Sequence, residues 1–211
     1  MCRILFARSL TPFSISELLE PFAQVAESSS EYQGHGWGCS WLSNRQWQHY
    51  HDINPVWLDG LSQFPDTNLL LVHARSAFRD EGIEVANNMP FDDDESVFIF
   101  NGELRGVRIN SPGRIGAEKI YNYIRRFDKG NKLEALTRAT SIIAKRSSYV
   151  RAMNIILSDG SQSCLSTSYS ENPAYFQMYR KQKEDKLIVC SQPFAGDTDW
   201  SPIDNNTTVA L

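Results

Sequence analysis

The chain has 211 residues and a formal net charge of −4, and 41% of its residues are hydrophobic. These values are typical of a globular protein, and we expect residues 1–211 to form a single domain. The acidic balance argues against a nucleic-acid partner, and the apolar runs are too short to span a membrane.

The cysteines of the chain form no CxxC pair, and no secretory signal pattern precedes them. They are Cys2, Cys39, Cys164 and Cys190. This pattern favours a reduced, cytoplasmic protein with neither a disulfide framework nor a zinc site.

The first third of the chain predicts a strand, a helix and a second strand. Residues 2–8 (CRILFAR) favour the first strand, and residues 15–27 carry apolar side chains at helical spacing. Ser14 is a candidate cap for this helix, and Pro21 is expected to bend or restart it. A polar, glycine-bearing loop then leads to the second strand, at 37–42.

The rest of the chain predicts mostly strands, with two helices between them. Residues 43–67 are expected to be irregular, apart from a short helix at 55–64. Strands are predicted within 68–78 and 92–104, each running into polar residues. Two helices and four strands follow, at 117–127, 132–146, 151–158, 163–170, 174–181 and 186–192. This order predicts an α+β fold with two sheets and a helical layer on each.

Cys2 follows the initiator methionine directly, at the start of the first predicted strand. Removal of Met1 leaves a free α-amine on the residue that carries the thiol. The reference pKa of such an amine is about 8, so it can accept the thiol proton, directly or through a water molecule. Cys2 is therefore a candidate nucleophile with its own base. The structural alternative is a small, buried cysteine.

Two motifs at strand ends carry further candidate residues. In VHARSAF, side-chain alternation places His73 and Arg75 on one strand face, and Arg75 suits a substrate carboxylate. In FIFNGEL, the Asn101 side-chain amide and the Gly102 backbone N–H are candidate donors to an oxyanion. The structural alternatives are a satisfied histidine, a surface ion pair and an Asn-Gly turn.

The segment GHGWGCSWL surrounds Trp37 with glycines, which indicates close backbone approach and an aromatic wall of a site, or a packing motif. The histidines His35, His49 and His51 allow a metal-dependent hydrolase as a distant alternative. They lack a further ligand at a recognised spacing, so we expect neither a metal nor a cofactor.

The order of these blocks is more specific than any one of them. Cys2, then GWG, HAR, NNMPF and FIFNGEL, resembles the class II glutamine amidotransferase domain, which has the N-terminal-nucleophile (Ntn) hydrolase fold. MCRILFA and NIILSDG are similar to its small stand-alone branch. The resemblance implies a four-layer αββα sandwich of two mainly antiparallel sheets.

The resemblance also implies residue roles. Cys2 matches the nucleophile that forms a thioester, and its α-amine matches the general base. Arg75 matches the residue that holds the substrate α-carboxylate, and Asn101 with Gly102 matches the oxyanion hole. His73 and Trp37 are assigned to the substrate side of the same cleft.

The sequence departs from the family pattern at three positions. Phe100 stands where a histidine is usual, and His35 stands where an aspartate is common. Gly116 takes the place of the aspartate that binds the substrate α-amino group. The absence of this aspartate would weaken substrate binding by about 1.5–3 kcal/mol. Glu118 and Asp159 are the candidate replacements.

These residues predict an amidohydrolase that cleaves glutamine or a γ-glutamyl-type amide, or an amidotransferase that supplies ammonia to a separate acceptor or synthase subunit. A homo-oligomer is compatible with this prediction. The alternative is a non-catalytic or substrate-divergent relative that binds a metabolite or a protein partner, because Gly116 replaces the expected aspartate.

Overall fold

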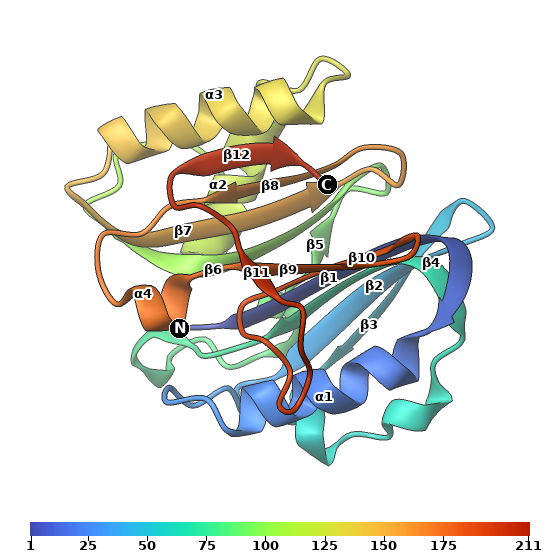
Figure 1. Ribbon diagram of the computed structural model, residues 1–211. Coiled ribbons are helices and arrows are strands. Elements are labelled where there is room, and N and C mark those ends of the chain that lie inside the picture. The colour runs from blue at the N-terminus through green and yellow to red at the C-terminus, as the bar shows by residue number, and fades with distance from the viewer.

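The computed structural model describes all residues from Met1 to Leu211, and two antiparallel sheets lie face to face at its centre (Figure 1). α1 (Ile15–Glu27) covers the outer face of one sheet. α2 (Gly116–Arg125) and α3 (Lys132–Lys145) cover the outer face of the other. The predicted αββα sandwich is confirmed. A short helix, α4 (Pro173–Phe176), connects the two sheets.

The first sheet has seven strands in the order β11-β9-β10-β1-β4-β2-β3, and the second has five in the order β12-β8-β7-β6-β5. The strands of the first are Ser201–Pro202, Tyr179–Lys183, Lys186–Cys190, Arg3–Ser14, Asp66–Ala74, Trp37–Ser43 and Gln46–Asp52. Those of the second are Thr207–Ala210, Ser163–Thr167, Tyr149–Ser158, Val97–Arg105 and Phe91–Asp92. In both lists, strands named one after the other are hydrogen-bonded neighbours in the sheet.

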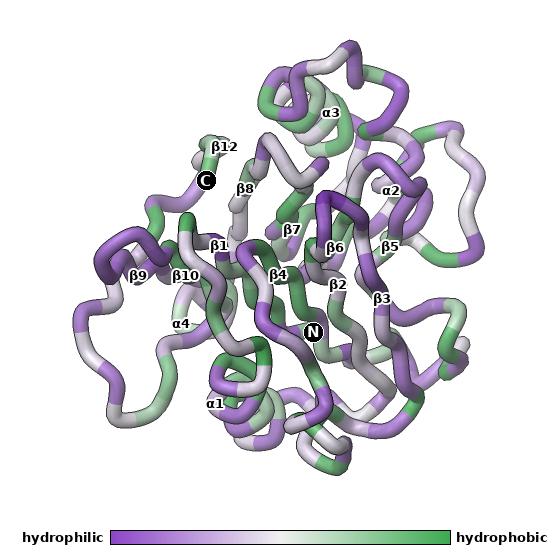
Figure 2. Tube along the Cα trace, turned by 90° about the vertical axis from the view of Figure 1, so that its right-hand side faces the viewer, coloured by the Kyte–Doolittle hydropathy of each residue, from purple (hydrophilic) through white to green (hydrophobic).

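β1 lies inside the first sheet, paired antiparallel with β10 and β4, and its alternation divides the core in two. Ile4 and Phe6 belong to a cluster of 26 buried residues that also includes the second sheet, α2 and α3. Leu5 and Ala7 belong to a cluster of 20 that includes α1. Figure 2 shows the layers from the side, with hydrophobic stretches along the strands between α3 and α1. The chain start is therefore anchored in both cores.

Two predicted elements are wrong. Residues 46–52, expected to be irregular, form edge strand β3, because Asn44 and Arg45 take positive φ angles (51° and 63°) and close a tight hairpin with β2. Residues 174–176, expected as a strand, lie in helix α4, since Pro173 occupies its first turn. The strand there begins only at β9. The C-terminal strands β11 and β12 were not expected at all.

The three longer helices match their predicted ranges closely, and α1 runs through Pro21 without interruption. Ser14 caps α1 as expected, with its hydroxyl accepting the backbone N–H of Glu17 at 3.3 Å. The segment 55–64 contains two 3-10 turns, Val56–Leu58 and Leu61–Gln63. None of the helices combines the length and apolar character that crossing a bilayer requires.

Candidate active site

A cavity of about 830 Å³ opens where β1 begins and β4 and β6 end, at the end of the sandwich that holds the chain start (N in Figure 1). Its walls come from the first residues of the chain, the segment after β4, the end of β6 and the start of α2. Cys2, Arg75 and Gly102 line it. The fold thus brings three of the predicted residues, far apart in sequence, to one cavity.

The Cys2 thiol is half-buried and held by the segment that follows β4. Its Sγ accepts the backbone N–H of Ser76 at 3.5 Å and lies 3.7 Å from the Ser76 carbonyl oxygen. Burial raises the pKa of this thiol, although the nearby N-terminal ammonium, the Ser76 N–H and Arg75 each act to lower it. Because its pKa is raised, the thiol needs a base to become a nucleophile.

Arg75 is a buried cation without a carboxylate partner. Its side chain donates to the carbonyl of Gly82 at 2.8 Å and to Oδ1 of Asn88 at 3.4 Å, and only 5% of the residue is exposed. Burial lowers the pKa of the guanidinium, and the proximity of Cys2 and Glu84 opposes this effect. An arginine remains charged in proteins, so Arg75 contributes a positive charge to the cavity that no carboxylate of the chain pairs with.

Asn101 and Gly102 lie next to each other on β6. Asn101 is fully buried, and neither its amide nitrogen nor its amide oxygen has a hydrogen-bond partner. Gly102 lies opposite Met153, which exchanges both of its backbone hydrogen bonds with Ser168 on its other side. The N–H of Gly102 therefore points away from β7, because opposite residues of an antiparallel pair share two bonds or none.

Gly102 also meets a close approach that only glycine allows. A Cβ at this position would lie 2.2 Å from the carbonyl oxygen of Ala152 and 2.7 Å from the ring of Phe100. The side chain of Phe100 lines the cavity beside Gly102. Phe100, which stands where the family usually has a histidine, therefore forms an apolar part of the wall.

Three of the predicted site residues, Asn101, His73 and Trp37, are not among the residues that line the cavity. His73 is fully buried without a partner for either ring nitrogen, and burial, reinforced by Arg75, lowers its pKa to about 3. Its imidazole is therefore neutral at physiological pH. Trp37 packs in the core on the α1 side, against Tyr50 and Phe64, and donates to Asp59 at 2.9 Å.

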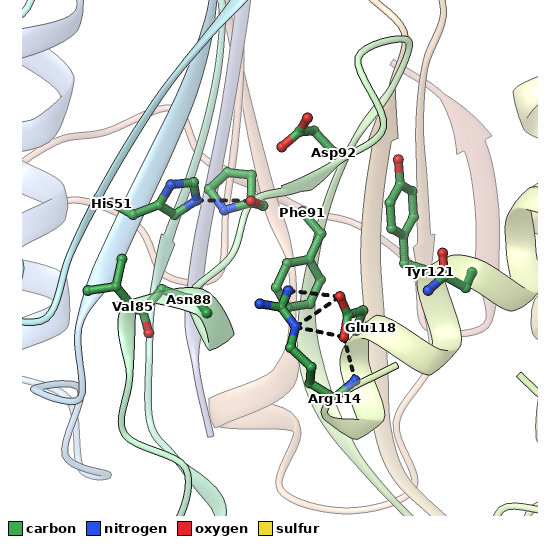
Figure 3. Close-up of a pocket in the computed structure, with 11 residues that line it drawn as sticks. His51, Val85, Asn88, Phe91, Asp92, Arg114, Glu118 and Tyr121 are labelled. Atoms are coloured by element: carbon green, nitrogen blue, oxygen red, sulfur yellow. Dashed lines mark hydrogen bonds and ion pairs between the residues drawn. The ribbon is translucent and has the colours of Figure 1, made fainter. Parts of the chain in front are cut away.

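Gly116 lines the cavity, but neither candidate replacement for its missing carboxylate does. Glu118 forms a two-pronged ion pair with Arg114 and faces a separate cavity of about 250 Å³ (Figure 3). Asp159 lies in the turn after β7, where it accepts backbone N–H groups and approaches Lys132 at 3.7 Å. The space beside Gly116 is open, since a Cβ there would meet no atom within 4 Å.

The remaining histidines are engaged separately rather than gathered. His35 accepts the N–H of Ala77 at 2.9 Å, His49 bonds the hydroxyl of Ser40 at 2.8 Å, and His51 bonds the carbonyl of Pro90 at 3.0 Å. The structure contains no group of three His, Cys, Asp or Glu residues positioned for a metal ion. The histidines therefore offer no geometry for the metal-dependent alternative.

Comparison with solved structures identifies proteins of similar fold. No protein-family model and no curated protein sequence matches the chain. Among solved structures, a glutamine aminotransferase class-II domain protein from Silicibacter pomeroyi is similar over 99% of this chain and 94% of its own, at 16% identity and a TM-score of 0.69. A predicted glutamine amidotransferase from Pseudomonas aeruginosa is similar over 99% and 96%, at 15% identity and a TM-score of 0.62.

A larger enzyme contains the same fold as one part. Glutamine phosphoribosylpyrophosphate amidotransferase from B. subtilis is similar over 90% of this chain but only 42% of its own, at 11% identity and a TM-score of 0.63. The chain therefore has the Ntn-hydrolase fold of class II glutamine amidotransferase domains, as its sequence motifs predict.

Proposed function

We propose that the protein is a cysteine-dependent amidohydrolase of the class II glutamine amidotransferase type. One observation carries the proposal: the thiol of Cys2 and the buried, unneutralised guanidinium of Arg75 line the same cavity. A nucleophile and an anion-binding group in one cavity suit an amide whose other end carries a carboxylate. The shared fold supports this assignment.

The proposed reaction begins after Met1 has been removed. The α-amine of Cys2 takes the thiol proton, and the sulfur attacks the amide carbon of the substrate. The carbonyl oxygen becomes an oxyanion that the Asn101 amide and the Gly102 N–H stabilise. The protonated amine then gives its proton to the leaving nitrogen, the C–N bond breaks, and a thioester remains. Water, deprotonated by the same amine, hydrolyses the thioester to a carboxylate and restores the thiol.

The substrate is a glutamine or γ-glutamyl-type amide, and its carboxylate binds Arg75. For an unsubstituted amide the leaving group is ammonia, which is released or passed to a separate acceptor or synthase subunit. A reducing compartment such as the cytoplasm suits this chemistry, because all four cysteines are free in the structure.

The test is the release of ammonia or the free acid from a panel of glutamine, γ-glutamyl amides and glutaramate, which is glutamine without its amino group. The protein must start at Cys2, as confirmed by intact mass. We expect turnover of at least one amide and its loss in Cys2→Ala. Equal activity in Cys2→Ala overturns the mechanism.

A covalent label separates the enzyme from a binding protein that only shares its fold. Diazo-oxo-norleucine, an electrophilic glutamine analogue, should modify Cys2 and leave the buried Cys39, Cys164 and Cys190 unlabelled. Labelling confined to those three cysteines, together with no turnover across the panel, would favour the non-catalytic alternative.

A further inference from the structure

We propose that Glu31, Gln33 and Tyr175 form a cradle for the α-amine of Cys2 and that Glu31 sets the pH at which this amine acts as a base. The inference rests on the proposed function, because it concerns the amine exposed when Met1 is removed. None of the three residues is conspicuous in the sequence. They come from the loop after α1 and from α4.

The three side chains hold both ends of Met1. The Met1 ammonium forms an ion pair with the carboxylate of Glu31. The Met1 carbonyl oxygen accepts hydrogen bonds from Nε2 of Gln33 at 2.6 Å and from the hydroxyl of Tyr175. This carbonyl belongs to the peptide bond with Cys2, so Gln33 and Tyr175 contact the peptide group that contains the backbone nitrogen of Cys2. That nitrogen becomes the α-amine once Met1 has been removed.

While Met1 is present, the side-chain amide of Gln33 has too many acceptors around its nitrogen and no donor to its oxygen. Gln33 is fully buried, and its Oε1 has no donor. Its Nε2 has two hydrogens but lies within bonding distance of Met1 O, Glu31 O (2.6 Å) and the Tyr175 hydroxyl (3.1 Å), with a longer contact to Ser29. Removal of Met1 takes away one acceptor and creates an amine donor nearby. Both changes improve the balance.

The carboxylate of Glu31 has two cationic partners, and one of them is the ammonium group that is lost with Met1. Arg151 is the arginine that approaches Glu31, at 3.5 Å, and it is shared with Glu103 at 3.3 Å and Glu171 at 2.6 Å. Glu103 has Arg105 as a second partner, at 2.7 Å. The Met1 ammonium is the second partner of Glu31. The processed α-amine is the cation that can replace it.

A carboxylate beside the α-amine favours its protonated form. The protonated amine cannot take the thiol proton, so Glu31 fixes the lower limit of the active pH range. Removing the Glu31 charge should shift that limit to lower pH by about one unit, and it should make the Cys2 thiol reactive at lower pH as well. A residue that only supported the fold would not produce this shift.

The experiment compares Glu31→Gln with the matched control Glu81→Gln, in protein that starts at Cys2. Glu81 is an exposed glutamate that lines the same cavity and forms no ion pair. The two readouts are the pH dependence of kcat/KM for amide hydrolysis and that of Cys2 alkylation by iodoacetamide. We expect both acid limbs to move down in Glu31→Gln, to stay in place in Glu81→Gln, and to stay near wild type in Glu31→Asp.

Unchanged acid limbs in Glu31→Gln overturn the cradle, and a raised KM with an unchanged limb assigns Glu31 to the substrate instead. The alkylation readout needs no turnover. If no amide is hydrolysed, the proposed function fails while the alkylation profile still decides for or against the cradle.

Discussion

Arg114 lines the smaller cavity and Arg75 lines the larger one, and these two arginines differ in how their charge is balanced. In the smaller cavity, Arg114 donates to both carboxylate oxygens of Glu118 at 2.8–3.1 Å (Figure 3). In the larger cavity, Arg75 has only the Gly82 carbonyl and the Asn88 amide as partners. Arg75 is also the more deeply buried of the two. The charge of Arg114 is therefore balanced within the chain, whereas no carboxylate of the chain lies within ion-pair distance of Arg75, whose proposed partner is the carboxylate of the substrate.

Helix α2 separates the two environments. Glu118 faces the smaller cavity, whereas Gly116 and Lys119 face the larger one. The carboxylate of this helix turn is thus paired with Arg114, and the same turn contributes Gly116 and the cationic Lys119 to the lining of the Cys2 cavity. A carboxylate that is close to a site in the sequence can therefore lie outside it, since the helix face on which it sits decides which cavity it lines.

The largest expected effect concerns the proposed oxyanion donors, Asn101 and Gly102, of which Gly102 lines the Cys2 cavity. Asn101→Ala should lower kcat by about 10²–10³, since one preorganised donor is lost. Its effect on unfolding should be small, because no partner of Asn101 is left unpaired. Steady-state kinetics and urea unfolding test both expectations.

The matched control for this change is Asn154→Ala, directly opposite Asn101 on β7. Asn154 bonds the Phe176 carbonyl and the Thr167 hydroxyl at 2.7–2.8 Å. Its loss should reduce the free energy of unfolding by about 1–3 kcal/mol while kcat stays near wild type. Near-normal kcat in Asn101→Ala would contradict the proposed oxyanion hole.

The next effect compares the two arginines directly. Arg75→Gln should raise KM for an anionic amide by about tenfold to a hundredfold, because a charge-assisted pair contributes about 1.5–3 kcal/mol. Arg114→Gln should leave KM within about twofold and lower stability by less than about 1 kcal/mol, as is usual for partly exposed ion pairs. Equal KM changes in both variants would remove the distinction between the two cavities.

An intermediate effect is expected from His73, the buried imidazole close to Arg75. Its pKa is about 3 in the folded state, against about 6.5 in an unfolded chain, so the unfolded state binds the proton first as pH falls. Stability is therefore retained above pH 6.5 and lost below it, by about 1.4 kcal/mol per pH unit, or about 2 kcal/mol at pH 5. Urea unfolding at pH 7.5 and pH 5 measures this loss.

His73→Gln should remove that part of the pH dependence, and His49→Gln, on edge strand β3, should keep it. Arg75→Gln should weaken it, because the Arg75 charge contributes to the lowered pKa of His73. A wild-type slope in His73→Gln would show that other groups cause the acid sensitivity.

Most of the fold could be predicted because the buried strands and the three longer helices have clear periodicity. β3 was missed because it is an edge strand with mostly polar side chains, QWQHYHD, and its hairpin turn is Asn44–Arg45 rather than a glycine turn. α4 was mistaken for a strand because Tyr175 and Phe176 are apolar and buried. In such short segments, local composition does not distinguish the two states.

Some residues of the candidate site were likewise predicted from the sequence, and others were not. The motifs predict Cys2, Arg75 and Gly102 for one site, and the fold brings these three residues to one cavity. Ser76 was missed because it acts through its backbone N–H, which its side chain does not reveal. Gln33 and Tyr175 are 142 positions apart in the sequence, so no local sequence pattern predicts that they are in contact.

The smallest expected effect comes from placing a carboxylate at position 116, on the part of α2 that lines the Cys2 cavity. Gly116→Asp should lower KM for L-glutamine relative to glutaramate by several-fold, since the new carboxylate can pair with the substrate ammonium at about 1 kcal/mol or more. The position accepts a side chain, because a Cβ there meets no atom within 4 Å. It also opens α2, where an acidic residue is favourable.

Gly116→Ala is the control, since it fills the same space without charge. Both variants should gain about 0.5–1 kcal/mol of stability from replacing a helical glycine, but only Gly116→Asp should change the preference between the two substrates. A higher KM for glutaramate in Gly116→Asp, without a gain for glutamine, would mean that the new carboxylate pairs with Arg75 itself. The charge of Arg75 would then be balanced within the chain, as that of Arg114 is, and Arg75 would no longer be free to bind the carboxylate of the substrate.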